Sequence, residues 1–282
     1  MNSPQVFVGR RAALLTRHSK ERVIAPVIES ATGCRVLVEN TYDTDLFGTF
    51  TLDIARPASQ IDTARLKAKK GMELVNADLG LSSEGSFGPH PFYPFIPWNR
   101  EIVMLVDNLN NIEIYGEYTG SETNFNQVNI KSFTEAEAFA QKVGFPEHFL
   151  IVSLRCMKTE FIKGINTWEQ LNEAVSWGIN KCSDGYVVLE TDMRAHANPT
   201  RMANIQKAAE NLVLKISQKC PQCGMIGFSL VEYKRGLPCE WCGNPTDDIQ
   251  AEICKCQSCG FIKEKKTGKE KADPGSCGLC NP

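Results

Sequence analysis

The cysteines between residues 220 and 280 are the side chains whose type and spacing point most clearly to chemistry. Eight of them form four Cys-x-x-Cys pairs: Cys220 and Cys223, Cys239 and Cys242, Cys256 and Cys259, and Cys277 and Cys280. Two residues between the cysteines let one tight turn present both thiolates, and four thiolates bind one Zn²⁺ ion tetrahedrally. The pattern predicts two structural zinc ions in closed sites, with iron in a rubredoxin-like site as the alternative.

The spacing between the cysteine pairs bears on how they combine. Fifteen residues separate the first pair from the second, and seventeen separate the third from the fourth. Both gaps are typical of two consecutive pairs that share one zinc ion. We therefore expect sequential pairing, although the spacing also permits a cross-braced arrangement in which the pairs alternate. Cys254 is an additional thiol that could compete with Cys256 as a ligand.

Two domains are expected. Residues 218–282 are too few to bury a core that folds unaided, so metal binding must supply folding free energy. The rest of the 282-residue chain alternates strand-like and helix-like segments, which is typical of an α/β fold. We predict an α/β domain over residues 1–217 and a tandem zinc-ribbon domain over residues 218–282.

Hydrophobic periodicity gives the expected elements. Strands are predicted at residues 11–16, 35–38, 79–83, 149–154 and 186–191, with a hairpin at 101–106 and 112–118. Helices are predicted at residues 21–31, 59–70, 134–143, 168–180 and 199–217. The expected N-caps are Ser19, Ser59, Thr167 and Asn198, and the expected helix ends are Gly33 and Gly71.

Cations follow two predicted strands, each at the start of a helix. Arg17 and Lys20 follow the first strand, and Arg194, His196 and Arg201 follow the strand at 186–191. Helix N-termini favour anions, and ligands of open α/β sheets bind beyond the carboxyl ends of strands. If the two strands are parallel neighbours, both groups face one crevice and form a phosphate site. Ordinary surface cations beside capped helices are the alternative.

Acidic and aromatic residues could complete a nucleotide site. Asp43, Asp45 and Glu84 lie near predicted strand ends, where one or two carboxylates together with substrate phosphates would hold Mg²⁺. Plain turn residues are the alternative. A loop rich in proline could cover a purine base or serve only in packing. Its aromatic residues are Phe92, Tyr93, Phe95 and Trp98.

The order of the elements resembles that of the house-cleaning inosine/xanthosine triphosphatases. The likeness rests on Thr16-x3-Lys20, on Glu84-Gly85 before the hairpin, and on the late strand that ends at Thr191. It implies a mixed-sheet, nucleoside-triphosphatase-like domain. In such a domain Lys20 would contact the phosphates, and Glu84 together with Asp45 would hold Mg²⁺. The whole chain is also similar to a bacterial family described only as a domain of unknown function. That second likeness includes the segment RAHANPTRM before the cysteines, and it implies C-terminal zinc ribbons but no activity.

Charge and hydropathy narrow the classes of function. The net charge of -2 argues against a generally basic nucleic-acid-binding protein, and no apolar run reaches the ~18 residues of a membrane span. No signal-peptide pattern is present, so a cytoplasmic protein is expected. Lysines gather near the Thr267-Gly268 turn. They could form a basic finger that binds a protein or nucleic-acid partner, or they could simply be the solvated tip of a hairpin. They are Lys263, Lys265, Lys266, Lys269 and Lys271.

Two functions are consistent with this sequence. The first is a Mg²⁺-dependent phosphohydrolase or pyrophosphatase that acts on purine nucleoside triphosphates, because metal and cations would neutralise phosphate charge. The second is a non-catalytic protein that senses a nucleotide, or that holds a macromolecule through its zinc ribbons.

Overall fold

The computed structural model describes residues 6–43, 59–155, 157 and 159–282. Asp45, predicted as a metal ligand, lies outside the described residues. No described helix combines the length and the apolar character needed to cross a membrane.

A five-stranded mixed sheet forms the centre of the N-terminal half, in the order β2-β1-β3-β4-β5. Its strands are β1 (Arg11–Leu15), β2 (Arg35–Glu39), β3 (Leu79–Pro89), β4 (Pro97–Asp107) and β5 (Ile112–Gly120). Strand β1 pairs in parallel with β2 and β3, and β3, β4 and β5 are antiparallel. The predicted mixed α/β fold and the predicted hairpin are therefore confirmed.

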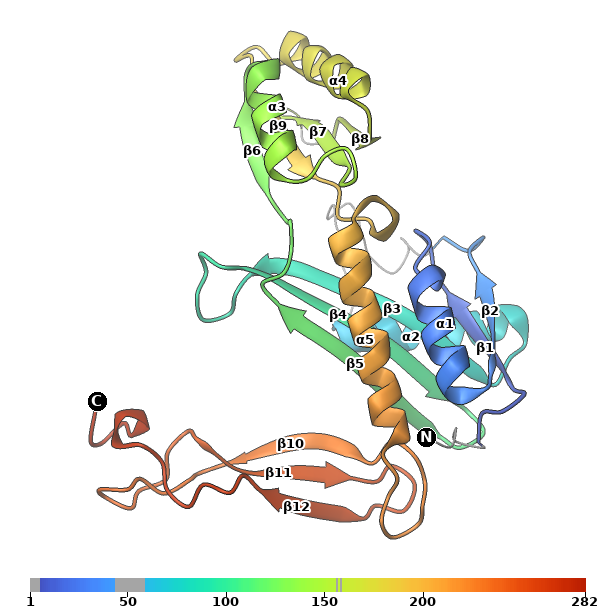
Figure 1. Ribbon diagram of the computed structural model, residues 1–282, viewed down its shortest axis with the longest axis vertical. Helices are drawn as coiled ribbons and strands as arrows, with labels where there is room; N and C mark the ends of the chain where they lie inside the picture. Colours follow the sequence, from blue (N-terminus) through green and yellow to red (C-terminus); the bar gives the residue numbers. More distant parts are fainter. Residues whose placement is uncertain (1–5, 44–58, 156, 158) are drawn as a thin grey trace.

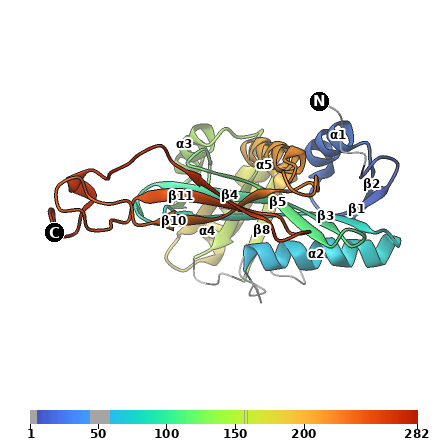
Figure 2. The same ribbon diagram turned by 90° about the horizontal axis from the view of Figure 1, so that it is seen from below.

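Helices cover both faces of this sheet. Helices α1 (Glu21–Thr32) and α5 (Pro199–Ser217) lie on one face and α2 (Gln60–Val75) on the other (Figure 2). The face under α1 and α5 buries residues such as Leu14, Val103 and Ile205. The face under α2 buries residues such as Ala68 and Ile102. Burial on both faces fixes which side chains of each strand point toward which helix.

Unequal strand lengths create an opening in the sheet. Strand β1 is five residues long, and its last register partner on β3 is Leu81. Strand β3 is eleven residues long, longer than the predicted 79–83, and continues to Pro89 paired only with β4. Beyond the carboxyl end of β1, the edge of β3 therefore faces the loop that leads into α1.

A second sheet, of four antiparallel strands, follows β5. Its order is β6-β9-β7-β8. The strands are β6 (Gln127–Ile130), β7 (Leu150–Leu154), β8 (Phe161–Ile165) and β9 (Val187–Thr191), with helices α3 (Phe133–Lys142) and α4 (Trp168–Lys181). It has its own hydrophobic core and lies at one end of the molecule (Figure 1). The condition that the strand at 186–191 is a parallel neighbour of the first strand is not met, because β9 belongs to this other sheet.

The helix ends test the capping predictions. Ser59, Thr167 and Asn198 each accept a backbone N–H bond at a helix start, and Gly33 ends α1 with a left-handed φ of 71°. The prediction for Ser19 is wrong, because Ser19 has a φ of 59° and Lys20 is the N-cap. Gly71 does not end α2. A Cβ there would lie 3.1 Å from the Cβ of Leu15, so glycine lets the continuing helix approach β1 closely.

A third sheet carries the cysteines. Strands β10 (Ser229–Arg235), β11 (Ile249–Lys255) and β12 (Ile262–Lys266) are antiparallel, and the only helical turn after α5 among the described residues is η3 (Pro274–Ser276). This sheet follows the end of α5 (Figure 1). The domain boundary after residue 217 stays a prediction.

The contact between β5 and α5 gives a test of the fold. A Cβ on Gly116 would collide with backbone atoms of Ala208 and Leu212, so we expect Gly116→Ala to lower the free energy of unfolding by about 1–3 kcal/mol. Gly88→Ala is the control, because no atom lies within 4 Å of a Cβ at that position. Urea unfolding of both variants measures the effect, and equal midpoints would contradict the close packing of α5 on β5.

Candidate metal centres and a buried charge cluster

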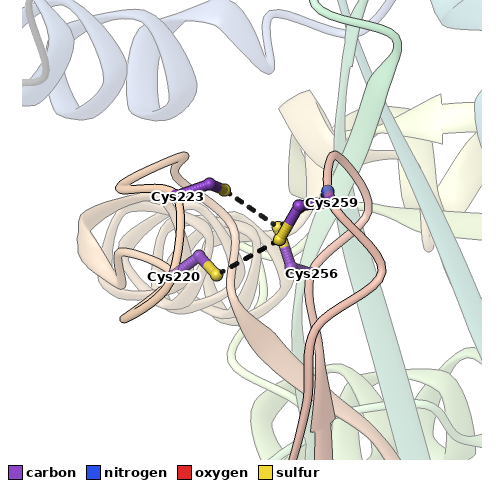
Figure 3. Close-up of side chains that lie close together, drawn as sticks. All are labelled: Cys220, Cys223, Cys256 and Cys259. Carbon is purple, nitrogen blue, oxygen red and sulfur yellow. Dashed lines mark hydrogen bonds between the residues drawn. The ribbon is translucent and has the colours of Figure 1, made fainter.

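The eight paired cysteines form two clusters. Cys220, Cys223, Cys256 and Cys259 make the proximal cluster, and Cys239, Cys242, Cys277 and Cys280 make the distal cluster. Within each cluster the ligand atoms all lie within 4.8 Å of one another. Sulfur–sulfur distances are 3.7 Å for Cys220–Cys259 and for Cys223–Cys256 (Figure 3). Four thiolates at the usual Zn–S distance of about 2.3 Å are roughly 3.8 Å apart, so the clusters fit zinc.

The pairing of the cysteines differs from the sequential arrangement that we expected. The first and third pairs share one cluster, and the second and fourth share the other. The strands explain this. Strand β10 carries the chain away from the first pair to the second, antiparallel β11 returns it beside the first pair, and β12 leads out again. Sequence spacing alone does not reveal these reversals.

Each cysteine pair forms the same turn. Gly224, Gly243 and Gly260 have φ values of 74°, 73° and 74° and donate N–H bonds to the carbonyl of the first cysteine of the pair. In the fourth pair Asn281 donates the equivalent bond. The Asn244 side chain donates to the Cys242 sulfur at 3.4 Å and lowers the pKa of that thiol to about 6, which favours the thiolate. Cys254 lies on β11 and belongs to neither cluster.

The proximal cluster is joined to the α/β domain. The Gln257 side chain accepts from the Glu113 N–H at 2.9 Å and donates to the Glu113 carbonyl at 2.6 Å. Ile226, which follows the first cysteine pair, is 4% exposed within the core that α5 covers. These contacts fix the proximal cluster against β5.

A group of buried charges, which we call the charge cluster, lies beyond the carboxyl end of β1. It consists of Lys20, Lys67, Glu84, Glu101 and Arg201. The largest exposed fraction among them is 9%, at Lys20. Charged side chains are seldom buried to this extent unless they are paired. Three of the five were predicted as site residues, namely Lys20, Glu84 and Arg201.

Two ion pairs hold the charge cluster together. The Arg201 Nε donates to Glu101 Oε1 at 2.9 Å, and Lys67 forms an ion pair with Glu84. Gly85 pairs with Glu101 across the β3–β4 ladder, whereas Glu84 pairs with Ile102 of the α2 face. The two acids therefore point to opposite faces of the sheet. A Cβ on Gly85 would lie 2.5 Å from a Glu101 carboxylate oxygen, so glycine makes room for this pair.

Lys20 occupies the opening beside β3. Its Nζ donates to the Ser83 carbonyl at 3.1 Å. Burial, followed by the nearby Arg201, lowers the pKa of Lys20 to about 7, although Glu84 and Glu101 act in the opposite direction. Among the described residues the charge cluster thus brings three basic side chains together with two carboxylates, and an anion would balance the charge of Lys20 when it is protonated.

Two histidines stack beside the charge cluster. The rings of His18 and His196 have centroids 5.0 Å apart at an angle of 24°. Burial and then Lys20 lower the pKa of His18 to about 3, and burial and then Arg194 lower the pKa of His196. Arg194 is held by the fully buried Asp192, to which its Nε donates at 3.0 Å. The loop after β1 and the segment between β9 and α5 are thus brought together, although β1 and β9 belong to separate sheets.

The remaining predicted site residues lie elsewhere. Arg17 and Asp43 form an exposed ion pair at 2.6 Å. Apart from the cysteine clusters, the described residues contain no group of three or more His, Asp or Glu side chains placed to share a metal ion.

The aromatic loop lies at the tip of the β3–β4 hairpin. Phe92 and Phe95 are 84% and 83% exposed, so they are not packed. The rings of Trp98 and His90 meet edge-on, with their centroids 4.4 Å apart. Strand β3 ends at Pro89, roughly 17 Å along the strand from Glu84. That this loop covers a purine base stays a prediction.

Three charged residues around the site were not predicted. Lys67 lies in a basic helical stretch typical of a solvated face, Glu101 reads as an ordinary strand residue, and Asp192 reads as part of a loop. The feature that could have identified Glu101 as a site residue is the register of the β3–β4 hairpin, which places Glu101 opposite Gly85. The burial of Lys67 depends on how α2 lies on the sheet, and local sequence does not encode that.

The chain belongs to a family described as a domain of unknown function (DUF6671), whose family model matches residues 67–282. This range includes both cysteine clusters and every member of the charge cluster except Lys20. Comparisons with curated proteins and with solved structures found no match.

The burial of Lys20 predicts a gain in stability when its charge is removed. The folded state loses this proton above about pH 7, whereas the unfolded chain keeps it to about pH 10.5. Lys20→Met should therefore raise Tm by about 2 °C or more at and below pH 7, and the gain should shrink as pH rises toward 10.5. Calorimetry across this range tests it, with Lys142→Met on exposed α3 as the control. A destabilised variant at pH 7 would contradict an unfavourable buried charge.

Double variants test the cysteine pairing. We expect purified protein to contain two zinc ions, one for each cluster. Cys220→Ser with Cys256→Ser should remove one ion, whereas Cys220→Ser with Cys239→Ser should remove both. Sequential pairing gives the reverse result. Metal analysis of the folded variants by mass spectrometry distinguishes the two arrangements.

Proposed function

We propose that the charge cluster binds the phosphates of a nucleotide, and that the protein is a Mg²⁺-dependent phosphohydrolase or pyrophosphatase of purine nucleoside triphosphates. The observation that carries this is the buried Lys20 at the carboxyl end of β1, with Arg201 and Lys67 nearby. Ligand sites of α/β sheets form at such strand ends. The resemblance of Thr16-x3-Lys20 and Glu84-Gly85 to inosine/xanthosine triphosphatases supports the same reading.

Each residue has a role in this proposal. Lys20 and Arg194 would donate charge-assisted hydrogen bonds to phosphate oxygens, and each such bond contributes roughly 1.5–3 kcal/mol. The neutral His18–His196 pair would form one wall of the site. Arg201 and Asp192 would act as positioning residues, because they orient Glu101 and Arg194 respectively.

Magnesium is consistent with the donors present. Mg²⁺ needs only one or two carboxylates when substrate phosphates supply further oxygens, and Glu84 lies beside Lys20 in the cluster. Glu84 would therefore hold the ion in exchange for part of its contact with Lys67. When bound, Mg²⁺ would neutralise phosphate charge.

A non-catalytic nucleotide sensor is the second candidate. It is favoured by the Lys67–Glu84 ion pair, which already satisfies part of the carboxylate. In this case the site binds phosphates, and the cations alone provide the affinity.

A titration combined with an activity assay tests the proposal. Wild type should bind inosine or xanthosine triphosphate in the presence of Mg²⁺ and release phosphate or pyrophosphate. Lys20→Met and Arg194→Ala should each weaken binding about tenfold or more, since roughly 1.4 kcal/mol is a factor of ten. Glu84→Gln should lower turnover more than affinity.

Controls separate the possible results. Lys142→Met, on an exposed part of α3, should bind and react like wild type. Binding that depends on Lys20 without any hydrolysis would replace the enzyme by the sensor. Binding unaffected by Lys20→Met and Arg194→Ala would show that the charge cluster is not the phosphate site.

A further inference from the structure

The two cysteine clusters differ in the residues between their ligands. In the proximal cluster these residues are Pro221, Gln222, Gln257 and Ser258, and Gln257 is hydrogen-bonded to Glu113. In the distal cluster they include Trp241 and Leu279, whose side chains are 77% and 71% exposed. An exposed tryptophan contributes little to folding through burial. Two large apolar side chains presented at one metal site therefore suggest a contact surface.

The cysteines of the distal cluster fix the backbone on both sides of Trp241 and of Leu279. Trp241 lies between Cys239 and Cys242, and Leu279 lies between Cys277 and Cys280. The sulfurs of Cys242 and Cys277 are 3.6 Å apart, and those of Cys239 and Cys280 are 3.8 Å apart. The two turns therefore face each other across a single site. A side chain anchored on both sides by ligands loses little backbone entropy when it binds a partner.

Lysines flank this end of the third sheet. Five of the nine Lys and Arg residues after residue 217 lie between residues 263 and 271, where the acids are Glu264 and Glu270. Lys263 lies toward the proximal end of β12, and Glu240 and Asp273 are two further acids beside the Cys239 turn. Lys234 engages Glu264 at 3.2 Å. The Glu240 N–H donates to the Ala272 carbonyl at 3.0 Å, which places the segment that contains Lys271 and Asp273 beside the Cys239 turn. Lys266, Lys269 and Lys271 are all exposed.

We infer that this distal tip, made of Trp241, Leu279, Lys266, Lys269 and Lys271, binds single-stranded nucleic acid. An unpaired base would stack on the Trp241 indole, and the lysines would contact the backbone phosphates. Lysine is depleted from the cores of protein–protein interfaces but is common at phosphates. The surface therefore fits a nucleic acid better than a folded protein.

A single strand fits this tip better than a duplex. Stacking on Trp241 needs a base face that is free of its neighbours in a helix. Reading of a duplex usually places an α-helix or a two-stranded ribbon in the major groove. The described part of the zinc unit contains only the three-residue η3 as helix. It also contains the antiparallel strands β10, β11 and β12, but its apolar tip is formed by turns between ligands and not by these strands. This inference does not depend on the nucleotide site proposed above.

Fluorescence anisotropy with the zinc-loaded full chain tests the inference. The probe is a labelled single-stranded oligonucleotide of about 20 nucleotides, long enough for one site. Trp241→Ala should raise Kd about tenfold, as expected for the loss of one stacked base, while Trp241→Phe should retain most of the affinity. Lys269→Ala with Lys271→Ala should weaken binding and reduce the slope of log Kd against log salt by about 1.4.

Matched variants and competitors make the result decisive. Leu214→Ala removes an apolar side chain that is 59% exposed on α5, and Lys131→Ala with Lys142→Ala removes two exposed lysines of the second sheet region. Both should bind like wild type. The inference is overturned if Trp241→Ala binds normally with two zinc ions present, if a duplex binds as tightly as the single strand, or if polyglutamate competes as well as unlabelled oligonucleotide. Absence of binding by zinc-loaded wild type would overturn it equally.

Discussion

The buried pair of Arg201 and Glu101 connects the parts of this molecule that sequence separates most widely. It joins the first turn of α5 to β4, and the same guanidinium donates to the Met193 carbonyl, where the chain returns from the second sheet. Removing one member of a buried ion pair commonly costs about 3–5 kcal/mol, because the other charge stays buried. The position of α5 on the sheet, the return of the chain and the shape of the charge cluster therefore depend on one interaction.

The charge cluster departs from what stability alone favours. Apolar side chains of similar volume could fill the space under α1 and α2 without any desolvation penalty. Lys20 is instead buried beside Arg201 with its pKa lowered, and His18 and Ser19, before it, both have positive φ values. Unfavourable charge and backbone strain in the same loop are typical of sites that bind a ligand. This is the physical reason to look for function there before the exposed ion pair of Arg17 and Asp43.

Features of the fold that depend on residues close in sequence could be predicted, and features that depend on contacts between distant elements could not. The caps at Ser59, Thr167 and Asn198 depend on neighbours a few residues away, and so does the β4–β5 hairpin. The cysteine ligands were identified because their spacing has one strong chemical explanation. The cysteine pairing, the separate sheet containing β9, and the burial of Lys67 and Glu101 depend on how whole elements meet. Lys20 and Arg201 lie close together, but not in a crevice between parallel neighbours, because β1 and β9 belong to different sheets.

The alternation of the cysteine pairs has a consequence for the order in which the protein matures during synthesis. The last strand and helix of the N-terminal half are complete once Ser217 has left the ribosome, and N-terminal domains generally fold first. Neither metal site can then close on its first two pairs. The proximal site must wait for Cys259 and the distal site for Cys280. Four thiolates, from Cys220 to Cys242, therefore stay without their final partners while the following strands emerge, and the already folded β5 is the surface on which the first of these turns can settle.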